Sequence, residues 1–356
     1  IEEVPEVDAV LGTTSYGDIL KAIREAMEGK HFQEFKDIDY LPEKLGKRVL
    51  TTGGHFGYLK IAEGCDKHCT YCIIPKLRGK FRSVPMERLV TQAKEMAEEG
   101  VKELILVAQE TTVYGTDIYG KKSLHILLKE LCKIKGIRWI RVLYCYPEEI
   151  YDELIQTMKE EKKICHYLDL PIQHASDRIL KRMGRRTTQA ELVEIVNKLR
   201  REIPDIVLRT TLISGFPGET QEDHEELMSF VDEMEFDRLG VFTYSPEEDT
   251  PAATMPDQVA EEVKEARRDE IMELQQEISY DKGTDRIGQE LLVMIEGKVA
   301  DESAYIGRTY GDAPKVDGYI FVQTGELLMT GDFAKVRVTG ALEYDLIGEL
   351  ADEYTE

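Results

Sequence analysis

The chain has 356 residues, of which 42% are hydrophobic and 32% charged, a composition typical of a globular protein with roughly two or three domains. Its 46 lysines and arginines against 69 aspartates and glutamates leave a net charge of −23. Because RNA binding relies on basic residues that neutralise phosphates, this charge argues against a large RNA-binding surface and favours a basic partner.

No apolar run in the sequence approaches the ~20 residues that a membrane-spanning helix needs, so we expect no membrane contact. The first residues, which include Glu2 and Glu3, are unlike a signal or transit peptide. We therefore expect the protein to work in the cytoplasm, where cysteines stay reduced.

Residues 1–45 are not expected to form a domain of their own. Residues 7–12 predict a strand and residues 16–27 predict a helix. One strand and one helix cannot bury a core. We interpret residues 1–45 as a remnant of, or linker from, a domain that lies upstream.

Residues 46–283 alternate between strand-like and helix-like stretches and predict an α/β domain. The strand candidates, which are short and rich in Ile, Leu, Val or Tyr, are residues 58–63, 103–108, 139–144, 166–170, 207–213 and 239–244. The helix candidates between them are residues 87–99, 123–135, 152–160, 188–202 and 220–235, followed by a trailing helix at 257–282. Regular alternation indicates a parallel sheet with right-handed crossovers, here a partial TIM barrel of six βα units. In such barrels the chemistry lies at the C-terminal ends of the strands.

Residues 284–356 predict a small all-β barrel. Short strand candidates separated by glycine turns lie at residues 291–295, 304–308, 318–322 and 334–338. This segment holds 6 basic and 15 acidic residues, a net charge of −9, which is unusual for a β-barrel that binds RNA.

Three cysteines follow the first predicted strand closely. Cys65, Cys69 and Cys72 have the spacing Cys-x3-Cys-x2-Cys. Three thiolates can hold a four-iron, four-sulfur cluster and leave one iron open to a ligand that is not protein. Zinc is the alternative, since a closed zinc site needs a fourth ligand that His55 or His68 could supply. A disulfide is less expected because only 6 cysteines occur in 356 residues.

The cysteine loop resembles that of the radical S-adenosylmethionine (SAM) enzymes, whose motif is Cys-x3-Cys-x-aromatic-Cys, with Tyr71 in the aromatic position. This resemblance implies a partial TIM barrel and a cluster whose open iron binds the amino and carboxyl groups of SAM. Residues 58–65, 72–79 and 215–220 further resemble the methylthiotransferases of this superfamily, and the C-terminal barrel resembles their TRAM domain.

Residues 168–176, 306–318 and 344–346 resemble the RimO branch of that family. This resemblance implies methylthiolation of an aspartate β-carbon in protein S-twelve of the small ribosomal subunit, a basic ribosomal protein as partner, and an external electron donor. The other branch, which modifies an adenosine next to the tRNA anticodon, usually has Ser-Gly where this chain has His174-Ala175.

Two observations keep alternatives open. The basic segment 181–186 could contact RNA. A solvated helix end is the more common explanation for such a run of basic residues, so RNA contact is not favoured. A non-catalytic, zinc-stabilised scaffold that docks on the ribosome is an alternative of another class.

The family also carries a second cluster on three cysteines of an N-terminal domain. Because no cysteine precedes Cys65, we expect this chain to lack that domain and to hold one cluster.

The resemblance implies roles for residues at the strand ends. Tyr71 is expected near the adenine of SAM, with core packing as the alternative. Gln109 and Glu110 end the second strand, where the superfamily presents groups to the SAM amino end; ordinary loop residues are the alternative. Asp169 and Gln173 flank the end of the fourth strand, where Asp169 suits a ribose hydroxyl or caps a helix.

Four further residues are candidates. Arg209, inside a strand, needs an anionic partner, for which we expect the SAM carboxylate rather than a structural ion pair with Asp169. Gly215 is expected to let the backbone approach the cofactor. Tyr244 ends the sixth strand, where the superfamily contacts adenine. His174 is a candidate for proton transfer near the substrate, against the alternative of hydrogen-bonding support.

Overall fold

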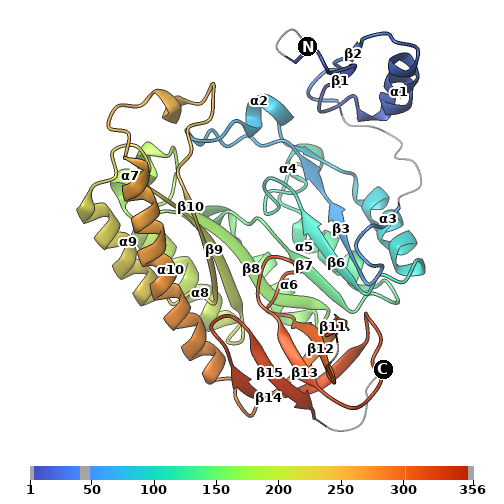
Figure 1. Cartoon of the computed structure of the whole chain (residues 1–356), viewed down its shortest axis with the longest axis vertical. Coiled ribbons are helices and arrows are strands. Elements are labelled where there is room, and N and C mark those ends of the chain that lie inside the picture. The colour runs from blue at the N-terminus through green and yellow to red at the C-terminus, as the bar shows by residue number, and fades with distance from the viewer. Residues whose placement is uncertain (1–3, 41–48, 301, 352–356) are drawn as a thin grey trace.

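The computed structural model describes residues 4–40, 49–300 and 302–351. Its centre is a curved, open sheet of six parallel strands, which lie side by side in the order in which they occur in the chain (Figure 1). The strands are β3 (Phe56–Lys60), β6 (Glu103–Val107), β7 (Trp139–Val142), β8 (Ile164–Gln173), β9 (Val207–Ser214) and β10 (Arg238–Thr243). This sheet confirms the predicted partial TIM barrel of six βα units.

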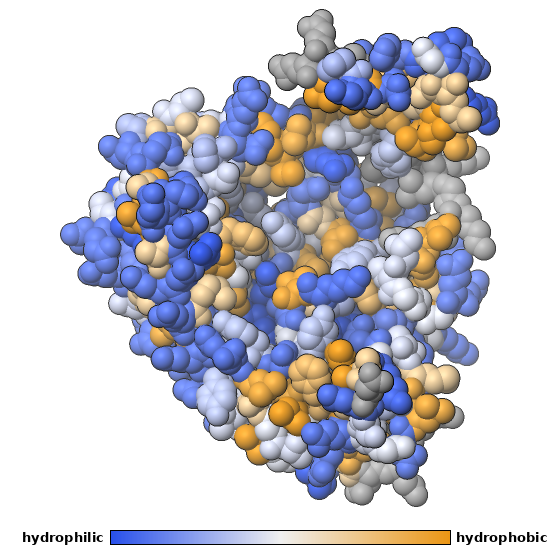
Figure 2. Space-filling view, in the orientation of Figure 1, coloured by the Kyte–Doolittle hydropathy of each residue, from blue (hydrophilic) through white to orange (hydrophobic). Residues whose placement is uncertain are grey.

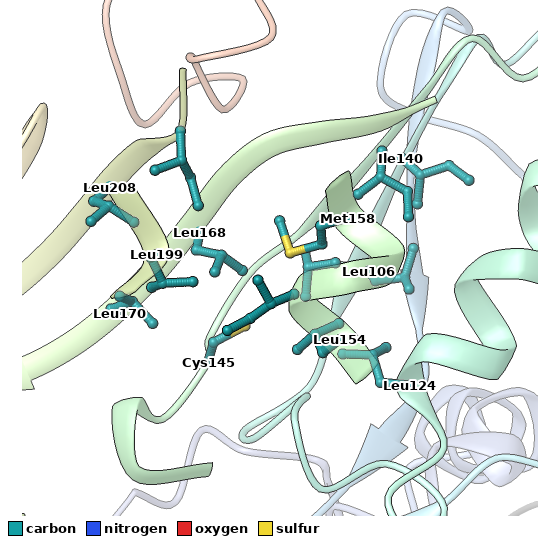
Figure 3. Packing of buried hydrophobic residues seen from close by; sticks show 14 of the residues in the cluster. Leu106, Leu124, Ile140, Cys145, Leu154, Met158, Leu168, Leu170, Leu199 and Leu208 are labelled. Carbon is teal, nitrogen blue, oxygen red and sulfur yellow. The ribbon is translucent and has the colours of Figure 1, made fainter. Parts of the chain in front are cut away.

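Long helices cover one face of the sheet. They are α3 (Met86–Glu98), α5 (Leu124–Cys132), α6 (Asp152–Glu160), α8 (Gln189–Glu202), α9 (Gln221–Met234) and α10 (Glu261–Thr284). Alternate strand residues such as Leu106, Ile140 and Leu168 point toward these helices, where Leu124 and Leu199 complete one hydrophobic core (Figure 3). Side chains of a strand alternate between its two faces, so the other face is left for polar and functional groups.

Two of these helices begin with a capping box, as the hydroxyl residues in the sequence predict. Thr188 and Thr220 each accept a hydrogen bond from the backbone N–H three residues later, and the acidic side chain at that position accepts one from the cap. Such caps contribute about 0.5–2 kcal/mol each.

Within the described residues, no helix is both long and apolar enough to span a bilayer.

Two short elements lie within longer predicted ones: β4 (Ala62–Glu63) ends the predicted strand 58–63, and a 3-10 turn at Tyr16–Asp18 begins the predicted helix 16–27. Other short elements were not evident in the sequence because they span too few residues to show a hydrophobic period. They are α2 (Ile74–Arg78), β5 (Arg82–Ser83), α4 (Thr116–Tyr119) and α7 (Asp177–Arg182), with 3-10 turns at Pro147–Glu149 and Pro251–Thr254.

The N-terminal segment contains the predicted strand and helix, β1 (Ala9–Leu11) and α1 (Ile19–Met27), and a further strand, β2 (Phe32–Glu34), that pairs in parallel with β1. Hydrophobic side chains gather on its surface (Figure 2), including Leu20 and Met27 of α1. The segment contacts the stretch that follows the cysteines, since Asp39 Oδ1 accepts a hydrogen bond from the Lys80 N–H at 2.9 Å.

The C-terminal segment is a closed five-stranded barrel. Its strands are β11 (Glu290–Lys298), β12 (Ala304–Thr309), β13 (Ile320–Gln323), β14 (Phe333–Ala341) and β15 (Leu346–Leu350), in the order β11-β12-β13-β15-β14. The predicted all-β barrel is therefore confirmed. The strand β15 was not predicted from the sequence; it pairs in parallel with β13 and antiparallel with β14, and so closes the barrel.

A buried ionic network joins this barrel to the sheet. Glu103, at the start of β6, is fully buried together with Arg141 of β7 and Arg308 of β12. Glu103 Oε1 accepts a hydrogen bond from Arg141 Nε at 2.8 Å, and Oε2 accepts one from Arg308 Nη2 at 2.6 Å. Burial opposes ionisation of the carboxyl, but the charges of the two arginines hold the pKa of Glu103 below its usual value. The carboxylate therefore clamps the two domains together.

The loop between β12 and β13 reinforces this contact. Asp312 Oδ1 accepts a hydrogen bond from Arg238 Nε at 3.0 Å, and Asp317 Oδ2 accepts one from the Tyr167 hydroxyl at 2.8 Å. Arg238 begins β10 and Tyr167 lies in the first half of β8, so the barrel covers the N-terminal part of the sheet. The C-terminal ends of the strands are left to the cysteine loop.

We expect Glu103→Ala to lower the free energy of unfolding by about 3–5 kcal/mol, because it leaves two buried arginines without their shared carboxylate. Urea unfolding measures this loss. Glu290→Ala is the matched control, since Glu290 pairs with Arg337 in the same barrel at 2.9 Å with both side chains 45% exposed, and its loss should stay under about 1 kcal/mol. Equal losses of unfolding free energy in the two variants would contradict the inference that Glu103 holds the two domains together.

Candidate active site

The cysteine loop begins at a turn that requires glycine. Gly64 follows β4 with φ +79°, and a Cβ at this position would lie 2.1 Å from the Lys80 carbonyl oxygen. This close approach lets the Cys65 N–H donate to the Gly79 carbonyl at 3.2 Å. Cys65 is thereby held at the C-terminal side of the first strand, where the sequence predicts the site.

Thr70 ties the middle of the loop to distant parts of the chain. Its N–H donates to the Met183 carbonyl at 2.9 Å, and its hydroxyl donates to the Arg182 carbonyl at 2.8 Å. Its own carbonyl accepts from the Ala252 N–H at 2.9 Å. The loop therefore spans the sheet, from the end of the first strand to the segments that follow β8 and β10.

The three thiols suit a cluster by their chemistry and surroundings. Cys65 and Cys69 are buried, Cys72 is half-buried, and none of the three is in a disulfide. Burial raises the pKa of the Cys65 thiol to about 11, and it also raises the pKa of Cys72. The Lys67 N–H already donates to Cys65 Sγ at 3.4 Å, which stabilises a thiolate. Three soft sulfur donors on one rigid loop fit an iron–sulfur cluster.

Neither histidine weighed as a zinc ligand joins the cysteines into a common site. His55 Nε2 lies 2.9 Å from Glu296 Oε2 of the β-barrel, and His68 is exposed. Among residues 4–40, 49–300 and 302–351, no three His, Cys, Asp or Glu side chains are placed to share one ion. A cluster, in contrast, binds each thiolate through a different iron.

Glu110 presents an unpartnered carboxylate oxygen in a buried position. Its Oε1 accepts hydrogen bonds from the N–H and the hydroxyl of Thr112, whereas its Oε2 is buried without a partner. Burial raises the pKa of Glu110 to about 7. The neighbouring Gln109 donates from Nε2 to Glu63 Oε1 at 3.3 Å, and its carbonyl oxygen is also buried without a partner. Both groups can accept hydrogen bonds from an ammonium group.

Arg209 is already paired within the protein. Its Nη1 donates to Asp169 Oδ1 at 2.8 Å, and its Nε lies 3.4 Å from Asp317 Oδ1 of the β-barrel. The other oxygen of Asp169 accepts from the Tyr144 N–H at 3.2 Å. The structure thus contains the ion pair that we weighed as the alternative to a SAM carboxylate for Arg209, and Asp169 serves as its partner.

Arg185, which was not singled out from the sequence, has unused donors beside the cysteine loop. Its guanidinium lies 4.3 Å from the centre of the Tyr146 ring, and Nη2 donates to the Pro171 carbonyl at 3.2 Å. Its Nε and Nη1 are buried without a partner. Arg185 lines a small pocket with Cys69, Tyr146 and Lys67.

The basic segment 181–186 is therefore only partly solvated. Arg185 is buried, and Arg182 is half-buried and donates from Nε to the Pro217 carbonyl at 2.9 Å. Lys181 and Arg186 remain exposed. The interpretation of the segment as a solvated helix end was wrong for Arg182 and Arg185. Both arginines directly flank the turn at Met183-Gly184, and this position is the only signal in the sequence that could have indicated their burial.

An aromatic cluster joins the cysteine loop to the last two strands. The rings of Tyr71 and Phe216 are 6.4 Å apart, and those of Phe216 and Tyr244 are 5.3 Å apart, both edge-to-face. Burial raises the pKa of Tyr71 well above its usual value. The Tyr244 hydroxyl is buried without a partner. The sequence-predicted adenine contacts Tyr71 and Tyr244 thus lie in one cluster.

Gly215 is needed for packing. It has φ +69°, and a Cβ there would lie 2.2 Å from Lys264 Cγ of α10. We expected the space beside Gly215 to admit a cofactor, but the side chain of Lys264 fills it. Lys264 Nζ donates to the Tyr244 carbonyl at 2.8 Å.

His174 lies in a buried supporting network. Its Nδ1 accepts from the Ser176 N–H at 2.9 Å, and its Nε2 is 3.6 Å from Glu219 Oε2. Glu219 also accepts from Arg267 Nη1 at 2.9 Å. The side chain is fully buried, in the supporting position that was the alternative to proton transfer. Gln173 precedes it with φ +73°, a conformation that is costly outside glycine and that turns the chain at the end of β8.

Two family models and several known proteins match this chain. A family model described as the radical SAM superfamily matches residues 59–231, and a TRAM domain model matches residues 287–351. The chain is 64% identical over 348 residues to ribosomal protein uS12 methylthiotransferase RimO of Lachnoclostridium phytofermentans, covering 98% of this chain and 79% of the relative. A relative of the same name from Clostridium perfringens is 53% identical over 355 residues, covering 99% and 79%. Coproporphyrinogen III oxidase (HemN) from Escherichia coli has a TM-score of 0.48 and 18% identity, covering 80% of this chain and 66% of that chain.

The raised pKa of Glu110 predicts how stability depends on pH in the ligand-free protein. Between pH 4.5 and about 7 the unfolded chain loses the Glu110 proton while the folded chain keeps it, so the folded state is progressively disfavoured as pH rises. Glutamine does not titrate. The free energy of unfolding of Glu110→Gln minus that of the wild type should therefore rise by on the order of 2–3 kcal/mol between pH 5 and pH 8. Urea unfolding at a series of pH values measures this gap, and a constant gap would contradict the prediction.

Proposed function

Because the chain belongs to the RimO family of ribosomal protein uS12 methylthiotransferases, we propose that it adds a methylthio group to the β-carbon of an aspartate in uS12, in the cytoplasm. The observation that carries the proposal is the cysteine loop, which lies at the C-terminal side of a partial TIM barrel beside buried polar atoms that lack partners. Parallel barrels place their chemistry at this end of the strands.

Cys65, Cys69 and Cys72 would hold one four-iron, four-sulfur cluster. Cys145 and Cys165 are buried among hydrophobic side chains, and Cys132 packs against the main core. None of these three cysteines is therefore assigned to the cluster site. When bound, the cluster and SAM supply a radical that can remove a hydrogen atom from an unactivated carbon. The protein's task is to orient SAM and the aspartate and to exclude water.

The unpartnered groups suggest how SAM is held. Glu110 Oε2 suits the SAM ammonium, because a buried carboxylate oxygen gains a charge-assisted hydrogen bond there. Arg185 suits the SAM carboxylate, since its Nε and Nη1 are free to donate beside Cys69. This assignment replaces Arg209, whose guanidinium is already shared by two aspartates. Tyr71 and Tyr244 would pack near the adenine, and Gln173 would lie close to the ribose, with Asp169 held by Arg209.

The charge of the protein suits a basic ribosomal protein as partner. The net charge is −23, and hydrophilic side chains cover the outer flank over α9 and α10 (Figure 2). RNA contact is not favoured, because Arg185 of the basic segment is buried and Arg182 donates to the Pro217 carbonyl. An external one-electron donor would reduce the cluster.

Product identification tests the proposed function. The protein, expressed from its full gene and reconstituted anaerobically with iron and sulfide, would be given SAM, a reductant, small-subunit ribosomal proteins and bulk tRNA. We expect mass spectrometry to find the methylthio group on an aspartate of uS12. The Cys65→Ala variant, which lacks one cluster ligand, should form no 5′-deoxyadenosine. A methylthio group on tRNA alone would overturn the substrate assignment, and turnover by Cys65→Ala would overturn the cluster site.

Arg185→Met should weaken SAM binding to the cluster-loaded protein about tenfold or more, because a charge-assisted hydrogen bond contributes about 1.5–3 kcal/mol. Equilibrium dialysis with labelled SAM measures the change. Lys181→Met is the control, since Lys181 is exposed in the same basic segment and does not line the pocket, and this variant should bind SAM like the wild type. If Arg209→Met weakened binding strongly and Arg185→Met did not, the assignment of the carboxylate anchor would be reversed.

A further inference from the structure

Tyr146 contacts the cysteine loop through its hydroxyl. It follows β7 in the segment between Tyr144 and Pro147, is buried, and places its hydroxyl oxygen 3.7 Å from Cys69 Sγ. The contact joins residues 77 positions apart in the sequence. Cys69 is itself buried, so water competes little for this hydrogen bond.

The direction of this hydrogen bond follows from chemistry. A cysteine that binds iron is a thiolate and can only accept, whereas a phenol keeps its proton near neutral pH and can donate. With the cluster bound, the Tyr146 hydroxyl is therefore the donor and Cys69 Sγ the acceptor.

Two cations lie over the Tyr146 ring. Lys67 Nζ is 5.1 Å and the Arg185 guanidinium is 4.3 Å from the ring centre. Each cation is held by an acidic neighbour, Lys67 by Glu149 at 2.5 Å and Arg185 by Glu148 at 3.6 Å. Cation–π contacts of this kind fix the ring and draw electron density from it, which strengthens the hydroxyl as a donor.

Hydrogen bonds to cluster sulfurs and nearby positive charge set the reduction potential of an iron–sulfur centre. Reduction adds one negative charge to the cluster, and a donor aimed at a ligand sulfur stabilises that charge. The donor therefore makes the cluster easier to reduce, which eases the first electron transfer of the reaction.

We propose that Tyr146 tunes the cluster by donating a hydrogen bond to the Cys69 thiolate, which raises the reduction potential. The inference rests on the proposed function, because it requires a cluster on Cys65, Cys69 and Cys72. One electron enters from an external one-electron donor, no bond is made or broken in the protein, and Tyr146 keeps its proton.

An anaerobic redox titration of the cluster-loaded protein, poised with dithionite and followed by electron paramagnetic resonance, tests the proposal without reliance on turnover. In Tyr146→Phe we expect the one-electron reduction equilibrium to move about tenfold toward the oxidised cluster, which is about 59 mV. Tyr151→Phe is the matched control: Tyr151 also has a cation over its ring, Lys122 at 5.4 Å, but its hydroxyl contacts His125 instead of a cysteine. The control should keep the wild-type potential.

A second measurement identifies the hydrogen bond itself. After exchange into heavy water, electron–nuclear double resonance on the reduced cluster should detect an exchangeable hydrogen in the wild type that is lost in Tyr146→Phe. If Tyr146→Phe binds no cluster, 3-fluorotyrosine at position 146, a stronger donor, should shift the equilibrium in the opposite direction. Equal potentials in the wild type, in Tyr146→Phe and in the fluorinated protein would overturn the proposal alone. A wild-type protein that binds no iron and sulfide would overturn the proposed function and this inference together.

Discussion

The carboxylate of Glu103 determines which end of the sheet is available for chemistry. It is fully buried between Arg141 and Arg308, one from the sheet and one from the β-barrel. Burial of any one of the three groups alone would carry a large desolvation cost, so the network favours the observed position of the barrel. That position covers the N-terminal part of the strands. The opposite end carries the cysteine loop, in agreement with the general rule for parallel barrels.

Buried polar groups occur at both ends of the sheet. Next to the β-barrel, the carboxylates of Glu103 and Asp312 accept hydrogen bonds from arginines, although Arg141 Nη2 is buried there without a partner. Next to the cysteine loop, Glu110, Arg185 and Tyr244 each keep a buried polar atom without a partner. Unpaired buried polar groups are costly, and those beside the cysteine loop are placed where a ligand at the C-terminal ends of the strands could complete them.

Several side chains at this site act through their neighbours. Arg209 orients Asp169, His174 lies against Glu219, and Lys264 fills the space left by Gly215. Tyr146 likewise contacts Cys69, one of the three cysteines that we propose as cluster ligands. Such supporting residues fix the geometry and electrostatics of a metal site and decide much of its behaviour.

The sequence by itself determined the fold class and singled out the three cysteines that we propose as cluster ligands. Periodic strands and helices are local signals, and Cys65, Cys69 and Cys72 lie within eight residues, so both patterns can be read without knowledge of distant contacts. Only the tertiary structure decided which buried arginine keeps unsatisfied donors. Arg209 is paired with Asp169 and with Asp317 from the loop after β12. Arg185 lies 3.6 Å from Glu148 through Nη2, but its Nε and Nη1 are buried without a hydrogen-bond partner. Charge pairing and burial depend on what the folded chain brings together, and no local pattern records them.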